Sequence, residues 1–155
     1  MSENKTLHIL SNSELFNGLT IEDLKKLYRY CQKVEFKETD TLIKEGQIVS
    51  ELYIIIKGQA EVLLPKQKQR LQTVKLAIKN VGGFFGEYSL IDSKPSSASI
   101  IATQPGELVK IANSDLDIIF KKNDRIAKTI YLNIIRVLIR RLRNINKEYD
   151  MIYLV

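Results

Sequence analysis

One stretch, residues 82–98, combines the residue types that a site for a small anion needs. It reads GGFFGEYSLIDSKPSSA, with three glycines, an acid at Glu87 and a run of hydroxyls. The glycines lack a Cβ, so the main chain can adopt positive φ angles and approach another group closely. Glu87 to Ile91 then resemble one short helical turn that ends before Pro95. Because a helix start presents unpaired N–H groups and the positive end of a dipole, this pattern predicts a cradle for an anion such as phosphate.

The remaining composition weighs against catalysis. The single histidine, His8, lies in an N-terminal segment that we expect to be mobile, and no two carboxylates have evident acid–base spacing. The single cysteine, Cys31, cannot form an internal disulfide or a thiolate metal cluster, and we expect it to pack as a small buried hydrophobe. We therefore expect a protein that is not an enzyme and holds no metal or cofactor.

Length, charge and hydropathy indicate one domain that is neither secreted nor inserted in a membrane. A chain of 155 residues can bury the core of one compact domain. Much of its net charge of +6 falls after residue 120, where a solvated helix face is favoured over a nucleic-acid surface. The apolar runs are shorter than the roughly 20 residues that span a bilayer, and Met1–Ile9 lack the apolar core of a signal peptide. These features predict a cytoplasmic protein without a membrane span.

The first third of the chain has a helical pattern. Residues 13–32 include a short turn at Ser13–Phe16 and a helix from Ile21 to about Cys31. Thr20 and Asp23, three residues apart, resemble a capping box at the start of that helix.

From residue 34 onward, alternating apolar and polar residues predict short strands. We expect one hairpin turn at Lys57–Gln59 and another at Pro105–Gly106, and a half-buried strand at Leu71–Ile78. The spacing of the strands suggests an antiparallel sandwich or barrel. The other predicted strands are Val34–Phe36, Thr41–Ile43, Leu52–Ile56, Ala60–Leu64, Ser97–Ala102 and Glu107–Ile111.

The chain ends in helices. Ser114 and Asp117 predict a capping box for a short helix through Phe120, and Asn123 or Asp124 can cap the next helix. Apolar residues spaced four and three apart form one seam on that last helix: Tyr131, Ile135, Leu138, Leu142, Ile145, Tyr149 and Ile152. The expected opposite face carries a basic stripe: Arg136, Arg140, Arg143 and Lys147.

The seam has two interpretations. It either packs on the protein's own barrel or, in its distal half, pairs with a second copy of the chain. A helix of roughly 28 residues at about 1.5 Å per residue is longer than a small barrel is wide, which favours the dimer.

The order of helix, β-block and long helix, combined with Phe85–Leu90 and the pair Ser97–Ala98, resembles the cyclic nucleotide-binding domain family. That family includes the catabolite activator protein, the regulatory subunits of cyclic AMP-dependent protein kinase and the cyclic nucleotide-gated channels. Further matches to the family pattern are Leu15–Phe16, Gly18–Leu19, Glu45–Gly46, Leu52–Ile55 and Gly58.

The resemblance implies a mainly β fold with flanking helices. The centre is a double-stranded β-helix, a jelly-roll-like β-roll of about eight strands, with N-terminal helices and a long, mobile C-terminal helix over the bound base. One domain then covers 1–155, with an N-terminal helical part at 1–33, a β-roll at 34–112 that includes a phosphate cassette at 82–98, and C-terminal helices at 113–155. We expect no DNA-binding domain, since the chain stops at Val155.

The resemblance also implies roles for individual residues. Glu87 accepts a hydrogen bond from the ribose 2′-hydroxyl, because a carboxylate can only accept, and the amides of Tyr88 and Ser89 face the ligand. The alternative for Glu87 is an acid that only stabilises the first turn of a helix. The expected ligand-binding residues are Gly86, Glu87, Tyr88, Ser89, Lys94, Ser96, Ser97 and Ala98.

Position 96 departs from the family pattern. Members that bind cyclic nucleotides usually carry an arginine there that holds the phosphate, and this chain has Ser96. Since a charge-assisted bond contributes about 1.5–3 kcal/mol, its loss weakens binding by roughly one to two orders of magnitude. Lys94 either substitutes as a flexible point charge or points into solvent. Glu87, without its usual cation, is expected to become neutral or to recruit another partner.

We expect a regulatory module that resembles sensors of cyclic AMP or cyclic GMP, with weak binding because of Ser96. The alternative is a degenerate domain that binds neither nucleotide and serves protein interaction or dimerisation. The expected partners are a cyclic mononucleotide and either another protein or a second copy bound through Leu138, Leu142, Ile145, Tyr149 and Ile152. Sequence-blind nucleic-acid binding by the basic stripe is the weakest hypothesis.

Overall fold

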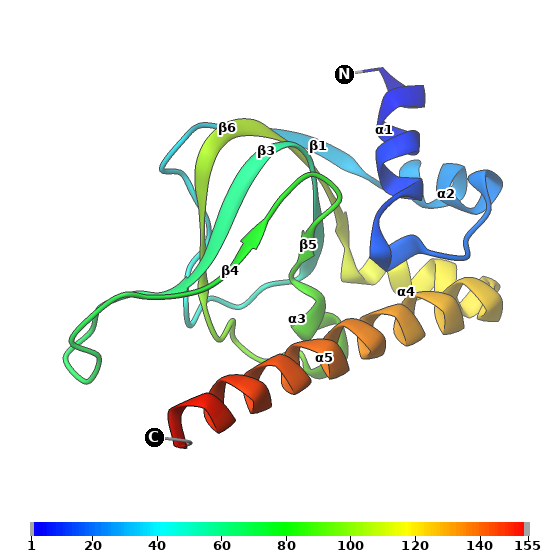
Figure 1. Cartoon of the computed structure of the whole chain (residues 1–155). Coiled ribbons are helices and arrows are strands. Elements are labelled where there is room, and N and C mark those ends of the chain that lie inside the picture. Colours follow the sequence, from blue (N-terminus) through cyan, green and yellow to red (C-terminus); the bar gives the residue numbers. More distant parts are fainter. Residues whose placement is uncertain (1, 154–155) are drawn as a thin grey trace.

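A β-roll with helices at one end forms the body of the protein, and a long helix runs beneath it (Figure 1). The computed structural model describes the backbone of residues 2–153 and the side chains of residues 2–151. The helices are α1 (Glu3–Ser11), η1 (Glu14–Phe16), α2 (Ile21–Tyr28), α3 (Glu87–Asp92), α4 (Asn113–Lys122) and α5 (Asp124–Tyr153). The strands are β1 (Gln32–Phe36), β2 (Thr41–Ile43), β3 (Glu51–Leu64), β4 (Val74–Lys79), β5 (Phe84–Phe85) and β6 (Ser99–Ala112). The predicted roll with N-terminal helices and a long C-terminal helix is confirmed, although helices take so large a share that the class is mixed α/β.

Two long strands form the centre of the roll. In the described residues the sheet has six strands, with the order β1-β6-β3-β4; β2 also pairs with β6, and β5 with β3. All of these pairs are antiparallel. The ladder between β3 and β6 extends from the pair Glu51–Ala112 to the pair Leu63–Ser99.

The predicted hairpin turns at Lys57–Gln59 and Pro105–Gly106 are wrong, because β3 and β6 each continue through their glycine. The two glycines face each other where the ladder shifts register between Lys57 and Ala60. A Cβ on Gly58 would lie 2.6 Å from the Pro105 carbonyl oxygen, and one on Gly106 would lie 2.0 Å from the Lys57 oxygen. Glycine therefore lets two paired strands bend together at this point, where the sequence pattern suggested that each chain turns back.

The edge strand β4 also differs from the prediction. The predicted strand is confirmed from Val74 onward, but it starts three residues later than expected and has no buried face, since Val74, Leu76 and Ile78 are 44–53% exposed. In the described residues β4 pairs with β3 alone, so it lies at an edge of the sheet.

The N-terminal segment is ordered as a helix, contrary to the expectation of a mobile tail. Leu7 and Leu10 of α1 are buried in the core between helices and sheet, and His8 lies on the same helix. The predicted capping box of Thr20 and Asp23 is confirmed, with both reciprocal hydrogen bonds present. Cys31 is half-buried against that core, and burial raises the pKa of its thiol to about 12.

The C-terminal helices follow the strands directly. Strand pairing continues to Ala112, so α4 begins at Asn113 and the predicted Ser114–Asp117 capping box is wrong. Asn123 does cap α5, because its Oδ1 accepts a hydrogen bond of 3.1 Å from the Ile126 amide. Among the described residues, no helix is both long and apolar enough to cross a membrane.

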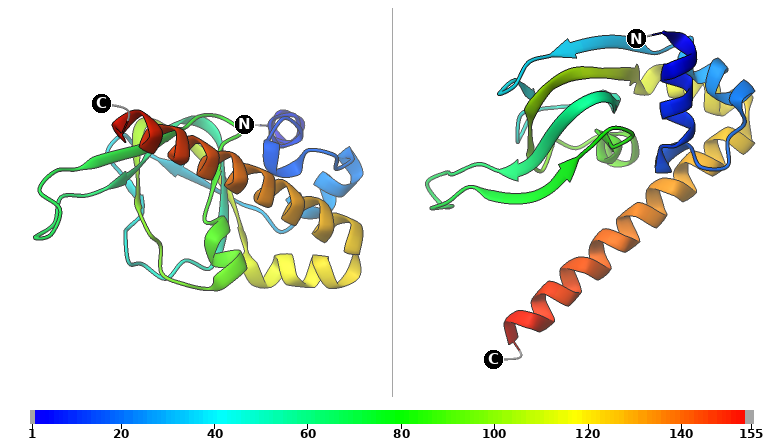
Figure 2. Two further views of the ribbon diagram at one scale, coloured as in Figure 1. Left: turned by 60° about the horizontal axis from the view of Figure 1, so that its bottom comes forward. Right: turned by 45° about the horizontal axis from the view of Figure 1, so that its top comes forward.

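Helix α5 packs on the body by a face that the predicted seam does not include. Ile126, Ile130, Ile134 and Val137 are buried in the core between helices and sheet. Buried Asn133 fixes the helix to η1, since its Nδ2 donates to the carbonyl oxygens of Leu15 at 3.0 Å and Asn17 at 2.8 Å. The distal half of α5 then extends past the roll (Figure 2).

The seam itself is mostly exposed. Tyr131 and Leu138 are half-buried against the core, whereas the seam's other described side chains are 47–59% exposed. The interpretation in which the whole seam packs on the protein's own barrel is therefore wrong. The exposed members are Ile135, Leu142, Ile145 and Tyr149; the side chain of Ile152 lies outside the described residues.

Candidate functional site

Gly86 sets the geometry at the start of the cassette. It precedes α3 with φ of 85°, and a Cβ there would lie 2.4 Å from the carbonyl oxygen of Glu51. Only glycine tolerates both that angle and that approach. The buried hydroxyl of Ser89 donates to the Gly86 carbonyl oxygen at 2.8 Å, which holds the first turn of α3 closed.

Glu87, the first residue of α3, is buried and paired with the long helix. Nη1 of Arg141, on α5, donates to Oε1 of Glu87 at 2.6 Å, and the Glu87 side chain is 5% exposed. The hydroxyl of exposed Tyr88 lies 3.4 Å from the same guanidinium nitrogen. Burial of Arg141 disfavours its charge, but Glu87 and Tyr88 more than offset this and raise its pKa above the ordinary value. The expectation that Glu87 recruits another partner is thus confirmed, with a cation that comes from α5.

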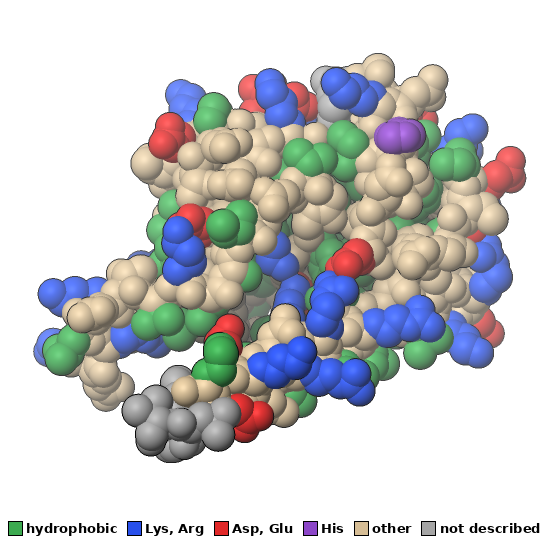
Figure 3. All heavy atoms as spheres, in the orientation of Figure 1, with side chains coloured by type: hydrophobic (Ala, Val, Ile, Leu, Met, Phe, Trp, Pro, Cys, Tyr) green, Lys and Arg blue, Asp and Glu red, His purple; other side chains and the backbone are tan. Residues whose placement is uncertain are grey.

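A second ion pair lies beside the first. Arg140 donates through both terminal nitrogens to Glu14 of η1, at 2.9 and 2.5 Å, and this hydrogen bonding lowers the pKa of Glu14. Lys79, at the end of β4, lies close enough to both pairs to feel their charges. Figure 3 shows a hollow between the roll and α5, with basic side chains inside it.

The distal part of the cassette is held by backbone contacts to the turn after β2. The Ser96 carbonyl oxygen accepts from the Gly46 amide at 2.8 Å, and the Ser96 amide donates to the Gln47 carbonyl oxygen at 2.8 Å. The Ser96 hydroxyl donates to the carbonyl oxygen of Ala98, which is buried, while Ser97 is exposed. Lys94 is exposed, and its amide donates to Asp92 Oδ1 at 3.0 Å.

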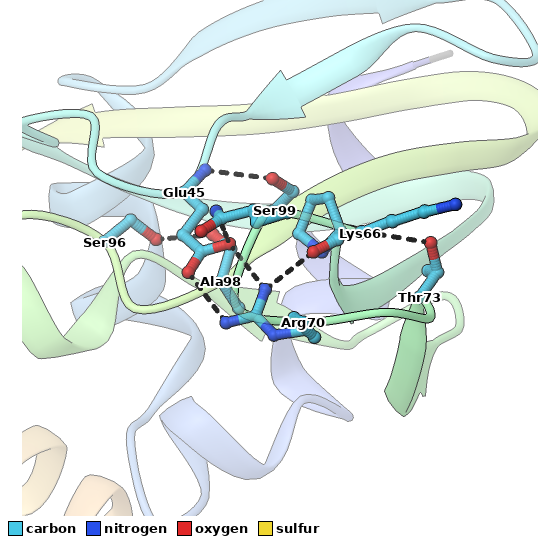
Figure 4. Close-up of polar contacts among 9 residues, drawn as sticks. Glu45, Lys66, Arg70, Thr73, Ser96, Ala98 and Ser99 are labelled. Atoms are coloured by element: carbon cyan, nitrogen blue, oxygen red, sulfur yellow. Dashed lines mark hydrogen bonds and ion pairs between the residues drawn. The ribbon is translucent and has the colours of Figure 1, made fainter.

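An arginine from a different part of the chain reaches this region. Arg70, in the loop between β3 and β4, donates to both carboxylate oxygens of Glu45, at 3.0 and 3.2 Å, and to the Pro65 carbonyl oxygen at 2.8 Å. The Glu45 amide donates to the hydroxyl of buried Ser99 at 2.9 Å, so these groups gather beside Ser96 (Figure 4). The hydrogen bonds from Arg70 lower the pKa of Glu45. These contacts hold the end of the cassette in place. The Arg70 guanidinium is already paired with the Glu45 carboxylate.

The structure therefore divides the predicted residues between two sets of contacts. Glu87 and Tyr88 meet α5, whereas Ser96 and Ala98 meet the turn after β2. Within the described residues, no group of three or more His, Cys, Asp or Glu side chains could hold a metal ion.

Sequence reasoning missed the partners Arg141, Lys79 and Arg70. A signal existed for Arg141, because it continues the buried stripe of α5 four residues after Val137, so it points inward although it looks like part of a basic run. Nothing comparable marks Arg70, whose contact with Glu45 spans 25 residues and depends on how the loop folds back.

Curated relatives resemble the chain over part of their length. The cyclic AMP receptor protein of Thermus thermophilus is 27% identical over 143 residues, which cover 92% of this chain and 63% of the relative. The cGMP-dependent protein kinase of Plasmodium berghei is 33% identical over 100 residues, 64% of this chain and 11% of the kinase. The chain thus spans less than two thirds of the length of these relatives.

Solved structures and a family model agree with this likeness. The crystal structure of the Thermus thermophilus catabolite activator protein matches with a TM-score of 0.77 and 26% identity over 90% of this chain and 63% of that one. A cyclic nucleotide-binding domain from Methylobacillus flagellatus matches in fold, with a TM-score of 0.79 and 24% identity over 96% of this chain and 81% of that one. The model of the cyclic nucleotide-binding domain matches residues 33–123, so the chain belongs to the cyclic nucleotide-binding domain family.

Proposed function

We propose that this domain is a regulatory cyclic nucleotide sensor in which α5 reports whether the pocket is occupied. The observation that carries the proposal is the 2.6 Å ion pair between Glu87 and Arg141. The acid expected to read the ligand's ribose is the same acid that holds the long helix. Ligand affinity and helix position are therefore linked through one carboxylate.

The two oxygens of Glu87 allow this double role. Arg141 binds Oε1, and within the described residues Oε2 has no hydrogen bond. A ribose hydroxyl can donate to Oε2, which changes how strongly the carboxylate attracts Arg141. Occupancy can shift α5 only as far as the ligand's affinity differs between the two helix positions.

The part of the pocket that is expected to hold the phosphate supports a low affinity for cyclic nucleotides. Ser96 replaces the arginine of family members that bind cyclic nucleotides, and its hydroxyl is engaged by the Ala98 carbonyl oxygen. Lys94 is exposed and Arg70 is bound to Glu45, so neither replaces the arginine in this arrangement. The cassette itself then offers a phosphate only neutral backbone donors, at Tyr88 and Ser89. We propose that the domain acts by binding and not by catalysis.

Calorimetric titration tests the proposal. Cyclic AMP and cyclic GMP are titrated into the wild-type chain and into Ser96→Arg, with Lys75→Arg as a control that adds a guanidinium at an exposed position of β4. Ser96→Arg is expected to bind about 10 to 100 times more tightly than the wild type. Absence of binding to the wild type at millimolar ligand, together with no gain in Ser96→Arg, would reject a cyclic nucleotide sensor.

The exposed seam of α5 favours a second candidate function, assembly through the long helix. Ile135, Leu142, Ile145 and Tyr149 are each about half exposed on one helix. Apolar side chains at heptad spacing are typical of helices that pair. We propose that the distal part of α5 pairs with a second copy of the chain, and this assembly is compatible with either a functional or a degenerate pocket.

A further inference from the structure

Lys79 is an unusual cation, because it lies near charged groups of both the roll and α5. It ends β4, opposite fully buried Ala60 of β3, and its ammonium lies 5.5 Å from the centre of the buried Phe84 ring. The other residues of β4 are exposed, whereas Lys79 is not. A partly buried lysine on such an apolar surface keeps only part of the water that normally solvates its charge.

The neighbouring charges do not neutralise it. Four ionic groups face Lys79: Glu14, Glu87, Arg140 and Arg141. These four form two ion pairs with one another, Arg140 with Glu14 and Arg141 with Glu87. Within the described residues the Lys79 ammonium has neither a hydrogen bond nor an ion pair, so it is the uncompensated charge of the group. Burial, followed by repulsion from Arg141, lowers its pKa to about 8.

We propose that Lys79 and Arg141 form an anion site on the α5 side of the pocket, which takes the phosphate of a small phosphorylated ligand. An anion between two nearby cations relieves their repulsion and supplies the hydrogen-bond acceptor that Lys79 lacks. The inference rests on the proposed function in one respect, since both require that a ligand enters this pocket. It differs in where the ligand's phosphate is bound: by cations of β4 and α5, and not at position 96 of the cassette.

The site also has a polar rim and an apolar floor. The Tyr88 hydroxyl lies 3.4 Å from Arg141, so it can donate to the same anion, while Phe84 lies beneath the lysine. Arg141 keeps its bond to Glu87 through one nitrogen, Nη1, which leaves other guanidinium N–H groups for the ligand. A fixed cation on the roll and a cation on the long helix would thus be bridged by the ligand.

Calorimetry with inorganic phosphate and cyclic AMP as probes tests this site in the full chain at pH 7. The variants are Lys79→Met, Lys79→Arg and, as a matched control, Lys75→Met, which removes an exposed lysine from the same strand, each checked for folding by circular dichroism. Lys79→Met is expected to weaken binding of both probes about tenfold or more, with Lys79→Arg and Lys75→Met close to the wild type. Binding of cyclic AMP by the wild type is also expected to weaken between pH 7 and pH 9.5, and its binding by Lys79→Met to stay level.

The possible failures are distinguishable. If the wild type binds cyclic AMP and Lys79→Met binds it equally well, the anion site is overturned while the nucleotide sensor stands. If inorganic phosphate and cyclic AMP both leave the wild type unbound at millimolar concentration, the anion site is overturned together with the sensor. If phosphate binds through Lys79 but cyclic AMP does not, the anion site stands and the cyclic nucleotide proposal fails.

Discussion

Arg141 of α5 donates a 2.6 Å hydrogen bond to the buried carboxylate of Glu87, 54 residues earlier in the chain. The contact joins the cassette helix α3 to the long helix at the point where α5 leaves the core. Val137, one turn before Arg141, is the last residue of α5 that is buried in that core. Beyond Arg141, every described side chain of the helix is exposed. The ion pair is therefore the last described tie between the distal part of α5 and the pocket.

Breaking the ion pair between Arg141 and Glu87 is expected to lower the free energy of unfolding more than breaking the neighbouring pair between Arg140 and Glu14. Arg141→Met leaves a buried acid unpaired, so we expect a loss of about 1.5–3 kcal/mol in the free energy of unfolding. Arg140→Met removes an exposed pair with Glu14 and should cost about 0–1 kcal/mol. Urea denaturation of both variants measures the difference.

A double-mutant cycle identifies the cause. Adding Glu87→Gln to Arg141→Met removes the unpaired charge and should recover part of the lost stability. Equal losses for Arg140→Met and Arg141→Met, or additive effects in the cycle, would show that the pair does not hold α5 to the cassette.

Gly86 offers a test of the cassette backbone. Gly46 and Gly86 have similar φ angles, 82° and 85°, but only at Gly86 would a Cβ collide with another group. Gly46→Ala should therefore cost about 1 kcal/mol for the angle alone. Gly86→Ala should cost about 3 kcal/mol or more, because the Glu51 carbonyl oxygen must also move. Thermal denaturation compares the two, and equal costs would mean that the cassette relaxes freely.

The sequence was sufficient for features that depend on local pattern. The capping box at Thr20 and Asp23, the cap at Asn123 and the helix start at Glu87 are decided within a few residues, and each was predicted correctly. The roll was predicted from the family resemblance, which rests on the order of helix, strands and long helix together with Phe85–Leu90 and Ser97–Ala98. Roles of individual cassette residues toward a ligand stay predictions, because they concern contacts with a molecule outside the chain.

Features that depend on contacts between distant segments were not predictable. Gly58 resembles a turn residue, and only its contact with Pro105 reveals a bend in paired strands. The seam of α5 is another example, since a heptad pattern does not specify whether its apolar side chains pack on the protein's own roll or on another molecule. Helix α5 uses its Ile126–Val137 stripe for the body because buried Asn133 fixes its rotation against η1.

The lowered pKa of Lys79 predicts a specific dependence of stability on pH. Burial lowers that pKa to about 8 from the model-compound value of 10.5, so between these values the unfolded chain binds the proton and the folded chain does not. Stability relative to Lys79→Met should therefore rise as the pH increases from about 8 to about 10.5, by at most about 3 kcal/mol. Below pH 8 both states are protonated, and the difference should be constant.

Guanidinium denaturation at a series of pH values measures this curve. Among the charges that face Lys79, Glu14, Arg140 and Arg141 keep their charge in that window, because hydrogen-bonded ion pairs lower the pKa of Glu14 and raise the pKa of both arginines. Lys75→Met, which removes an exposed lysine from the same strand, controls for the loss of one positive charge. Parallel curves for the wild type and Lys79→Met would mean that the ammonium is solvated in the folded state.

The exposed seam makes a prediction about assembly. Leu142 is 59% exposed near the middle of the four uncovered seam residues, and each side chain of this size contributes on the order of 1 kcal/mol when its exposed half is buried. We expect the wild type to dimerise and Leu142→Asp to shift it toward the monomer, because the substitution would place a charge in a desolvated helix pair. Light scattering after size-exclusion chromatography measures the mass over a range of concentrations. Ile118→Asp, at a 43% exposed apolar position on α4, is the matched control and should leave the dimer intact. A wild type that stays monomeric at high concentration, or equal dissociation in both variants, would rule out pairing through α5.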